Sequence, residues 1–132
     1  MIVVSKEVAQ VEIEKWLDCK KISERKRETT KDNTAALVDA ISEGGLVLTE
    51  KNELVQTLKF PIGETSPVEK LTYKPRLTVK EVNTKMQGVK ANDVDGRVTG
   101  YIAALTNLTM EEVKKLDTED YGLAQNIAIF FL

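Results

Sequence analysis

One six-residue pattern occurs three times between residue 77 and residue 132, and it limits the fold more than any other feature of the chain. Its copies are residues 77–82 (LTVKEV), 108–113 (LTMEEV) and 116–121 (LDTEDY). The Thr or Asp in second place can accept hydrogen bonds from the free N–H groups of a first helical turn, and the acid three residues later can reach back to the cap. The apolar first and sixth residues stand where a hydrophobic staple forms. The repeat therefore predicts three short helices with fixed starting angles, which form a packing surface and carry no catalytic group.

Composition sets the size and class of the fold. The chain has 132 residues, of which 30% are charged and 42% hydrophobic, so we expect one folded domain, alone or with a helical appendage. A net charge of −2 gives no bulk attraction to nucleic acid or to an anionic membrane. Cys19 is the single cysteine, and we find neither a leader peptide pattern nor an apolar run of membrane-spanning length. We therefore expect a cytoplasmic protein that is not secreted.

The absence of histidine from the sequence removes most common enzyme classes. Without it there is no usual general base at neutral pH, no usual zinc ligand and no Ser-His or Cys-His nucleophile. Carboxylate pairs occur at 111–112 and 119–120, but both fall in first helical turns, where acids favour the helix dipole. We interpret them as caps. Gly44 and Gly45 alone do not make a phosphate-binding loop. We expect no enzymatic activity, no cofactor and no metal site.

Residues 1–44 are predicted to form a charged, N-terminal helical arm. Its apolar residues fall into two stripes at helical spacing: Val8, Val11, Trp16 and Leu17, and then Leu37, Val38 and Ile41. The pair Gly44 and Gly45 is a helix stop. We place the domain that follows at residues 45–132.

A polar segment, residues 20–33, lies between these stripes. It contains six bases, interspersed with Glu24, Glu28 and Asp32. The acids lower the local potential and no aromatic side chain is interleaved for base stacking, so a solvated helix face or connector is favoured over a nucleic-acid site. The candidate basic patch, kept as an alternative, is Lys20, Lys21, Arg25, Lys26 and Arg27.

The middle of the chain changes to the two-residue period of strands. Residues 46–49 and 53–60 read as a hairpin, with Leu54, Leu58 and Phe60 on one face that Gln56 interrupts. A loop at residues 61–67 leads to a third strand in which Leu71 and Tyr73 alternate with polar residues, and Pro75 ends it. We predict an α+β fold: an antiparallel meander of about three strands at residues 46–74, covered by a C-terminal bundle of short helices.

The bundle begins with a helix from Thr78 to about Gln87, with Val79, Val82 and Met86 pointing one way. A longer helix from residue 92 or 93 has an apolar stripe, and its other face carries polar residues. The stripe is Val94, Val98, Tyr101, Ile102 and Leu105, and the polar face is Asp95, Arg97 and Thr99. Gly96 and Gly100 each cost about 1 kcal/mol relative to Ala in a helix interior, so they indicate either a close crossing by another element or a kinked first turn.

The last predicted helix, capped by Asp117, is apolar around more than half of its surface. Leu123, Ile127 and Phe130 form one stripe, and a second is formed by Tyr121, Ala124, Ala128 and Phe131. One domain face cannot bury all of these side chains. Either this helix is central to the core, or part of it is an interaction edge for a partner, which includes another copy of the chain.

The C-terminal two thirds of the chain resembles a known family. The residues that carry the likeness are 71–75 (LTYKP) leading into 77–81 (LTVKE), then 103–109 (AALTNLT) and 116–121 (LDTEDY). They are similar to the tail assembly chaperones of Mu-like and P2-like contractile-tailed phages and prophages, over roughly residues 46–132. Leu77 stands where the family often has Pro before Thr, and Asn107 replaces a frequent Gly. Residues 1–44 have no counterpart in the resemblance.

The resemblance implies a non-enzymatic assembly factor. Such proteins coat the long helical tape measure protein, keep it from aggregating and help to recruit tail-tube subunits before they leave the finished tail. By analogy, the partner-binding residues would be Tyr121, Leu123, Ile127, Phe130, Phe131 and Leu132. The family often makes a longer product by ribosomal frameshifting, and the codons for residues 129–131 (IFF) permit a slippery run of T bases.

Two other functions stay open at this point. A structural tail component, such as a terminator or tube-associated subunit, has a similar small α+β composition. A small DNA-binding regulator would use the basic N-terminal region and show salt-dependent affinity for duplex DNA.

Overall fold

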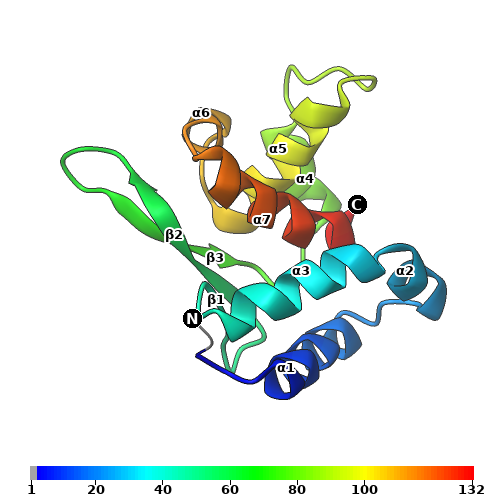
Figure 1. Cartoon of the computed structure of the whole chain (residues 1–132). Coiled ribbons are helices and arrows are strands. Elements are labelled where there is room, and N and C mark those ends of the chain that lie inside the picture. Colours follow the sequence, from blue (N-terminus) through cyan, green and yellow to red (C-terminus); the bar gives the residue numbers. More distant parts are fainter. Residues whose placement is uncertain (1–2) are drawn as a thin grey trace.

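The computed structural model describes residues 3–132, and within them seven α-helices and a short 3-10 helix surround one three-stranded sheet (Figure 1). The α+β prediction is confirmed. The N-terminal part contains α1 (Lys6–Cys19), α2 (Glu24–Thr29) and α3 (Lys31–Ser42). The helices that follow the sheet are α4 (Val79–Lys85), α5 (Val94–Thr106), α6 (Met110–Lys114) and α7 (Thr118–Ala128), and the 3-10 helix η1 (Ile129–Phe131) continues α7.

The sheet is the predicted antiparallel meander, in the order β1-β2-β3, with β1 (Leu46–Leu48), β2 (Leu54–Ile62) and β3 (Val68–Tyr73). Leu54 pairs with Leu48 on one side and with Tyr73 on the other. The β2–β3 hairpin projects from the body of the molecule (Figure 1). The predicted loop at 61–67 is shorter than expected, because β2 runs through Pro61 to Ile62.

The face of β2 departs from the prediction at Phe60, which is exposed. The register between β2 and β3 breaks between Thr57 and Ile62, so the simple in-and-out alternation does not continue there. Gln56 takes an inward position instead. Its amide donates to the carbonyl oxygen of Asp120 at 3.0 Å, and its own oxygen accepts from the Tyr73 hydroxyl at 2.6 Å. A buried polar side chain is tolerated because each end has a partner.

All three predicted helix starts are confirmed. Thr78 and Thr109 each accept from the N–H three residues later, and Thr109 forms a full capping box with Glu112. The N–H of Glu112 lies 3.1 Å from the Thr109 hydroxyl, and the Glu112 carboxylate accepts from the Thr109 N–H at 3.0 Å. This bond lowers the pKa of the Glu112 carboxyl. Asp117 caps α7 through the N–H of Glu119.

Asp120 does not serve as a cap, contrary to the interpretation of the 119–120 pair. Its carboxylate is buried and reaches across to the irregular stretch of β2, where it accepts from the N–H of Lys59 and of Phe60, each at 3.0 Å. The register break leaves these two N–H groups without strand partners. One carboxylate therefore satisfies both and ties α7 to the hairpin.

Two helix faces also differ from the expected stripes. In α1, Trp16 and Leu17 are buried as predicted, but Val8 and Val11 are exposed, and Ala9 and Ile13 take their place in the core. In α5, Val94 is exposed whereas Thr99 is buried. The Thr99 hydroxyl is satisfied inside the helix by the carbonyl of Asp95 at 2.9 Å and lies 2.9 Å from the Tyr121 hydroxyl. The second N-terminal stripe, Leu37, Val38 and Ile41, is buried as expected.

The hydrophobic core joins both parts of the chain. α1 packs on α3, α3 packs on α7, and the sheet is covered by α3, α5 and α7. Trp16 contacts Phe130 edge to face, with ring centroids 5.4 Å apart. The division at residue 44 stays a prediction, but side chains from the two sides of it share one cluster.

Candidate functional site

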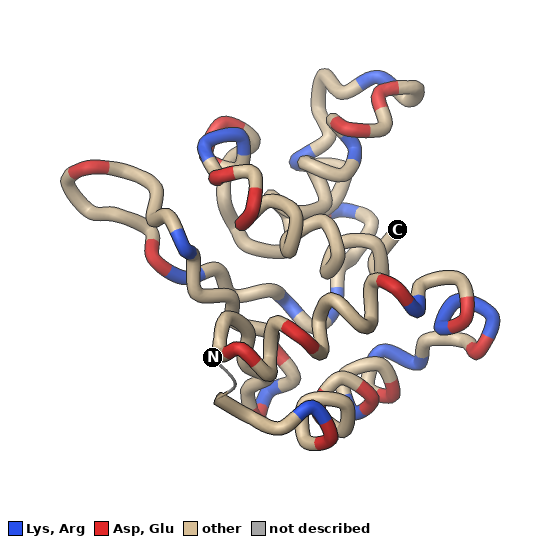
Figure 2. The backbone as a smooth tube through the Cα atoms, viewed as in Figure 1, with Lys and Arg blue, Asp and Glu red and all other residues tan. Residues whose placement is uncertain are grey.

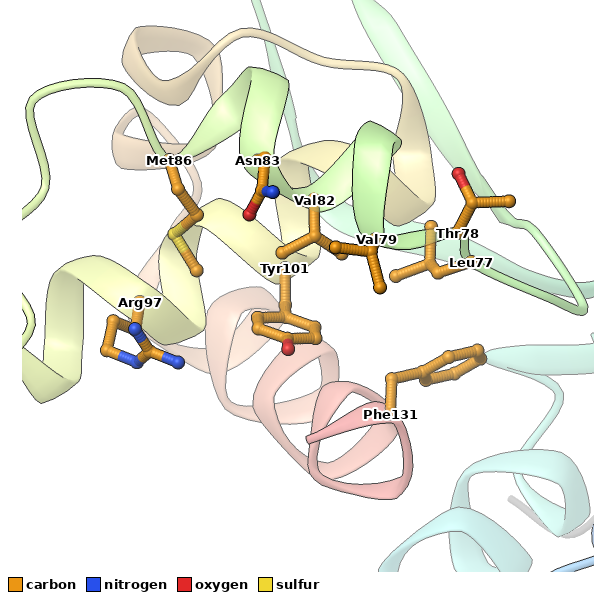
Figure 3. Close-up of a pocket in the computed structure, with 9 residues that line it drawn as sticks. All are labelled: Leu77, Thr78, Val79, Val82, Asn83, Met86, Arg97, Tyr101 and Phe131. Carbon is orange, nitrogen blue, oxygen red and sulfur yellow. The ribbon is translucent and has the colours of Figure 1, made fainter.

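The first candidate site is a groove within the C-terminal bundle, about 270 Å³ in volume, which we call the α4–α5 groove (Figure 3). It is lined by Leu77, Thr78, Val79, Val82, Asn83, Met86, Arg97, Tyr101 and Phe131. The Tyr101 ring lies in the middle of the groove, with Met86 and Arg97 toward one end and Leu77 and Phe131 toward the other (Figure 3). The lining is thus mixed: five of its nine residues are apolar, and the other four, Thr78, Asn83, Arg97 and Tyr101, carry polar groups.

The sequence places these side chains through the cap at Thr78. Once α4 starts there, Val79, Val82 and Met86 fall on one face at spacings of three and four. Val79 is 76% exposed, so the groove includes apolar surface that the chain itself does not cover. The expectation that these three residues share a face is met, since all three line the groove.

A close helix crossing forms one wall of the groove. A Cβ atom added at Gly100 would lie 2.5 Å from the Met86 sulfur, so α4 and α5 approach each other closely here and any larger residue would require the Met86 side chain to move. This agrees with the crossing that the glycine spacing suggested. The glycine at position 96 has a different reason: a Cβ atom there would collide with the side chain of Asp93, the N-cap of α5.

The predicted partner-binding residues divide by burial. Ile127 and Phe130 are in the core and are inaccessible to a partner in this conformation. Tyr121, Leu123 and Phe131 are partly buried, and Leu132 is 46% exposed. Of the six, Phe131 lines the α4–α5 groove, and Leu123 lines a second groove where α7 meets α3 and β2. The surface that a partner can reach is therefore smaller than the predicted set.

Residues of the N-terminal part contact the C-terminal turn directly. The Lys20 ammonium lies 3.2 Å from the centroid of the Phe131 ring, and Lys26 donates to the carbonyl oxygen of Leu132 at 2.7 Å. Burial, with Arg76 and Lys26 nearby, lowers the pKa of the Lys20 ammonium from 10.5 to about 8. These contacts fix the Phe131 wall of the groove.

Much of the candidate basic patch is engaged in such internal contacts. Besides Lys20 and Lys26, the Arg27 guanidinium pairs with Asp18 at 2.9 Å and donates to the carbonyl of Ile22. Lys21 and Arg25 are exposed. Blue and red segments alternate along α1 and α2 (Figure 2). The nucleic-acid alternative stays a prediction, and the acids interspersed among these bases lower the local positive potential.

Catalysis or metal binding would require a cluster of suitable side chains. Among residues 3–132, no three or more Cys, Asp or Glu side chains are arranged to hold a metal ion. Two surface ion pairs shift a pKa: the hydrogen bond to Glu119 raises the pKa of the Lys59 ammonium, and the hydrogen bond to Lys74 lowers the pKa of the Glu81 carboxyl. The Thr109 cap likewise lowers the pKa of the Glu112 carboxyl at the surface. In residues 3–132, none of the helices has the length and apolar character needed to span a bilayer.

Comparison with known proteins gives one match. Residues 68–132 match the family model described as phage tail assembly chaperone proteins, E, or 41 or 14. The matched segment runs from the first residue of β3 through η1 and contains every residue of the α4–α5 groove. No curated protein and no solved structure matches the chain.

Proposed function

Because residues 68–132 belong to the family of phage tail assembly chaperones, we propose that this protein binds the tape measure protein through the α4–α5 groove during assembly of the tail tube. The observation that carries the proposal is that the matched segment contains an open groove in which apolar side chains, including the exposed Val79, lie beside polar ones.

The chemistry of the groove suits a helical client. A tape measure protein is a long amphipathic helix, and such a helix docks by placing apolar side chains at three- and four-residue spacing into a groove. Met86 is flexible and polarisable, so it can adapt to anchors of different shape along a repetitive client. A groove of about 270 Å³ holds few anchors, which gives the modest affinity that a transient factor needs. The proposed location is the host cytoplasm, where tails are assembled.

The test is co-expression with the tape measure protein and measurement of its soluble fraction. Val79→Asp places a charge in the groove at the first residue of α4, where an acid favours the helix dipole, so folding should be retained. Val94→Asp is a matched control: Val94 is also an exposed valine at the first residue of a helix, and it lies outside the groove.

We expect Val79→Asp to weaken binding roughly tenfold, as for loss of one apolar anchor, and to lower the soluble fraction of the tape measure protein. Val94→Asp should behave as wild type. Equal solubility with all three chains would contradict the groove assignment. A Phe130→Asp change is unsuitable for this test, because Phe130 is buried and its loss would unfold the chain.

Composition of purified tails separates this function from that of a structural subunit. An assembly chaperone is absent from finished particles, whereas a terminator or tube component is present in fixed number. Quantitative mass spectrometry of purified particles would distinguish them, and detection in fixed stoichiometry would favour the structural alternative.

A further inference from the structure

A second and larger groove lies where α3, α7 and β2 meet, and it shares no residue with the α4–α5 groove. We call it the acid-rimmed groove. Its volume is about 710 Å³, within the ~300–1,000 Å³ usual for binding pockets. It is lined by Val3, Ala36, Asp39, Ala40, Glu43, Gly45, Thr57, Lys59, Glu119, Asp120, Gly122, Leu123 and Asn126.

Small residues on two helices form its floor. Ala36 and Ala40 are one helical turn apart on α3, and Gly122 lies in the interior of α7. A glycine there costs about 1 kcal/mol relative to alanine. A Cβ added at Gly122 would meet no atom of residues 3–132 within 4 Å, so packing inside the described chain does not require the glycine. The floor admits close approach of another backbone.

The rim carries an excess of negative charge. Asp39, Glu43 and Glu119 are exposed, and the base among the lining residues, Lys59, is already paired with Glu119 at 3.0 Å. Asp39 lies 3.4 Å from Lys6, with both side chains more than half exposed. Such surface pairs contribute at most about 1 kcal/mol and exchange readily for a better partner. The rim therefore complements a basic ligand.

We propose that the acid-rimmed groove binds a basic amphipathic helix of a partner protein. One or two apolar side chains of that helix would pack between α3 and α7 over Gly122, and its lysines or arginines would meet Asp39, Glu43 and Glu119. A second copy of this chain is a poorer occupant, because neither of its two helices with a net charge of +1 presents a free apolar face. The helix α2 (ERKRET) has no apolar residue to serve as an anchor, and α4 (VKEVNTK) packs on α5 and leaves Val79 as its one exposed valine. The protein would then have two separate docking surfaces.

The test uses the full chain labelled with ¹⁵N and two designed peptides of about 18 residues, long enough to be helical in water. One peptide carries leucines on one face and lysines elsewhere, and the other replaces each lysine by glutamate. We expect the lysine peptide to shift the amide signals of Ala36, Ala40, Gly122 and Leu123, and the glutamate peptide to leave them unchanged. Equal shifts with both peptides, or lysine-peptide shifts confined to the α4–α5 groove, would overturn the proposal.

Two variants and a control make the result specific. Gly122→Leu fills the groove while removing a helix-interior glycine, so the chain should stay folded and peptide affinity should fall at least tenfold. Glu43→Lys should weaken binding several-fold through the rim. Glu111→Lys reverses an exposed acid on α6 outside the groove and should bind as wild type. Unchanged affinity in a folded Gly122→Leu chain would refute the site.

Oligomeric state decides between the partner and a second copy. Light scattering should show the same mass for wild type and Gly122→Leu. A wild-type dimer that Gly122→Leu converts to a monomer would overturn the proposed partner and assign the groove to self-association. None of these readouts depends on the tape measure protein, so the proposal stands or falls independently of the α4–α5 groove.

Discussion

Replacement of Asp120 tests the reasoning about the buried contact between α7 and the hairpin. Its carboxylate, on a residue 3% exposed, accepts the N–H of Lys59 and of Phe60 at 3.0 Å each. Hydrogen bonds to a charged acceptor contribute about 1.5–3 kcal/mol each, or about 3–6 kcal/mol for the pair. The neighbouring side chains of Lys59 and Phe60 are exposed, so water can reach the freed N–H groups in part. We therefore expect Asp120→Ala to lower the free energy of unfolding by about 3 kcal/mol, at the bottom of that range.

Asp120→Asn should cost roughly half as much, because the amide retains one acceptor oxygen and turns a donor toward the second N–H. The assay is urea denaturation at pH 7, with a shift of the midpoint at constant m value. Glu119→Ala is the matched control: it removes the adjacent acid and an exposed ion pair with Lys59, which contributes below about 1 kcal/mol. If Asp120→Ala were no more destabilising than Glu119→Ala, the assigned role of the buried carboxylate would be refuted.

Three further outcomes follow from the packing and the pKa shifts. Gly100→Ala should destabilise the chain by about 1–2 kcal/mol through overpacking against Met86, whereas Gly122→Ala should stabilise it by up to about 1 kcal/mol. Thermal melts of both variants measure the difference, and equal shifts in melting temperature would contradict the close crossing of α4 and α5. Burial, aided by Asp120, raises the pKa of the Tyr73 hydroxyl, so its stabilisation is complete below its unfolded pKa of about 10 and is lost as pH rises beyond it. Tyr73→Phe should be less stable at pH 7 but show a flatter decline in alkali, measured by urea titrations across pH. The pKa of Lys20 is lowered to about 8 in the folded chain, so between pH 8 and 10.5 the unfolded chain binds more protons than the folded chain does. The free energy of unfolding should therefore rise with pH in this range, and Lys20→Gln should abolish the rise.

Local and periodic features of the fold could be predicted from the sequence. The starts of α4, α6 and α7 depend on atoms two or three residues apart, so Thr78, Thr109 and Asp117 identify them without knowledge of the rest of the molecule. The meander likewise follows from the two-residue period through Leu71 and Tyr73, both buried. These signals lie within one element or between neighbours along the chain.

The burial and the partners of side chains that depend on contacts between distant parts of the chain were predicted wrongly. In α1 two overlapping stripes are both apolar, and only packing on α3 and β1 decides that Ile13 is buried and Val11 is not. Asp120 looks like any acid of a first helical turn, and its role depends on the register break in β2. Phe60 is exposed by the same break.

The candidate site was recognised only in part. The shared face of Val79, Val82 and Met86 was visible in the sequence, but its uncovered position beside Tyr101 required the structure. The apolar C-terminal run gave no sign of which side chains α1 and α3 would cover, so Phe130 and Phe131 looked equivalent. Trp16 packs on both rings, yet only Phe131 also reaches the groove.

The family match covers a shorter segment of this protein than the unit that packs around one core. The match begins at the first residue of β3, so its boundary falls between two hydrogen-bonded strands, and α3 from outside it lies against α7 within it. Residues 68–132 excised alone would leave β3 as an unpaired edge, would remove α3 from α7 and would take Trp16 away from Phe130. An exchange of the matched segment with that of another protein would therefore have to include β2 and α3 as well, because the packed unit is larger than the matched sequence.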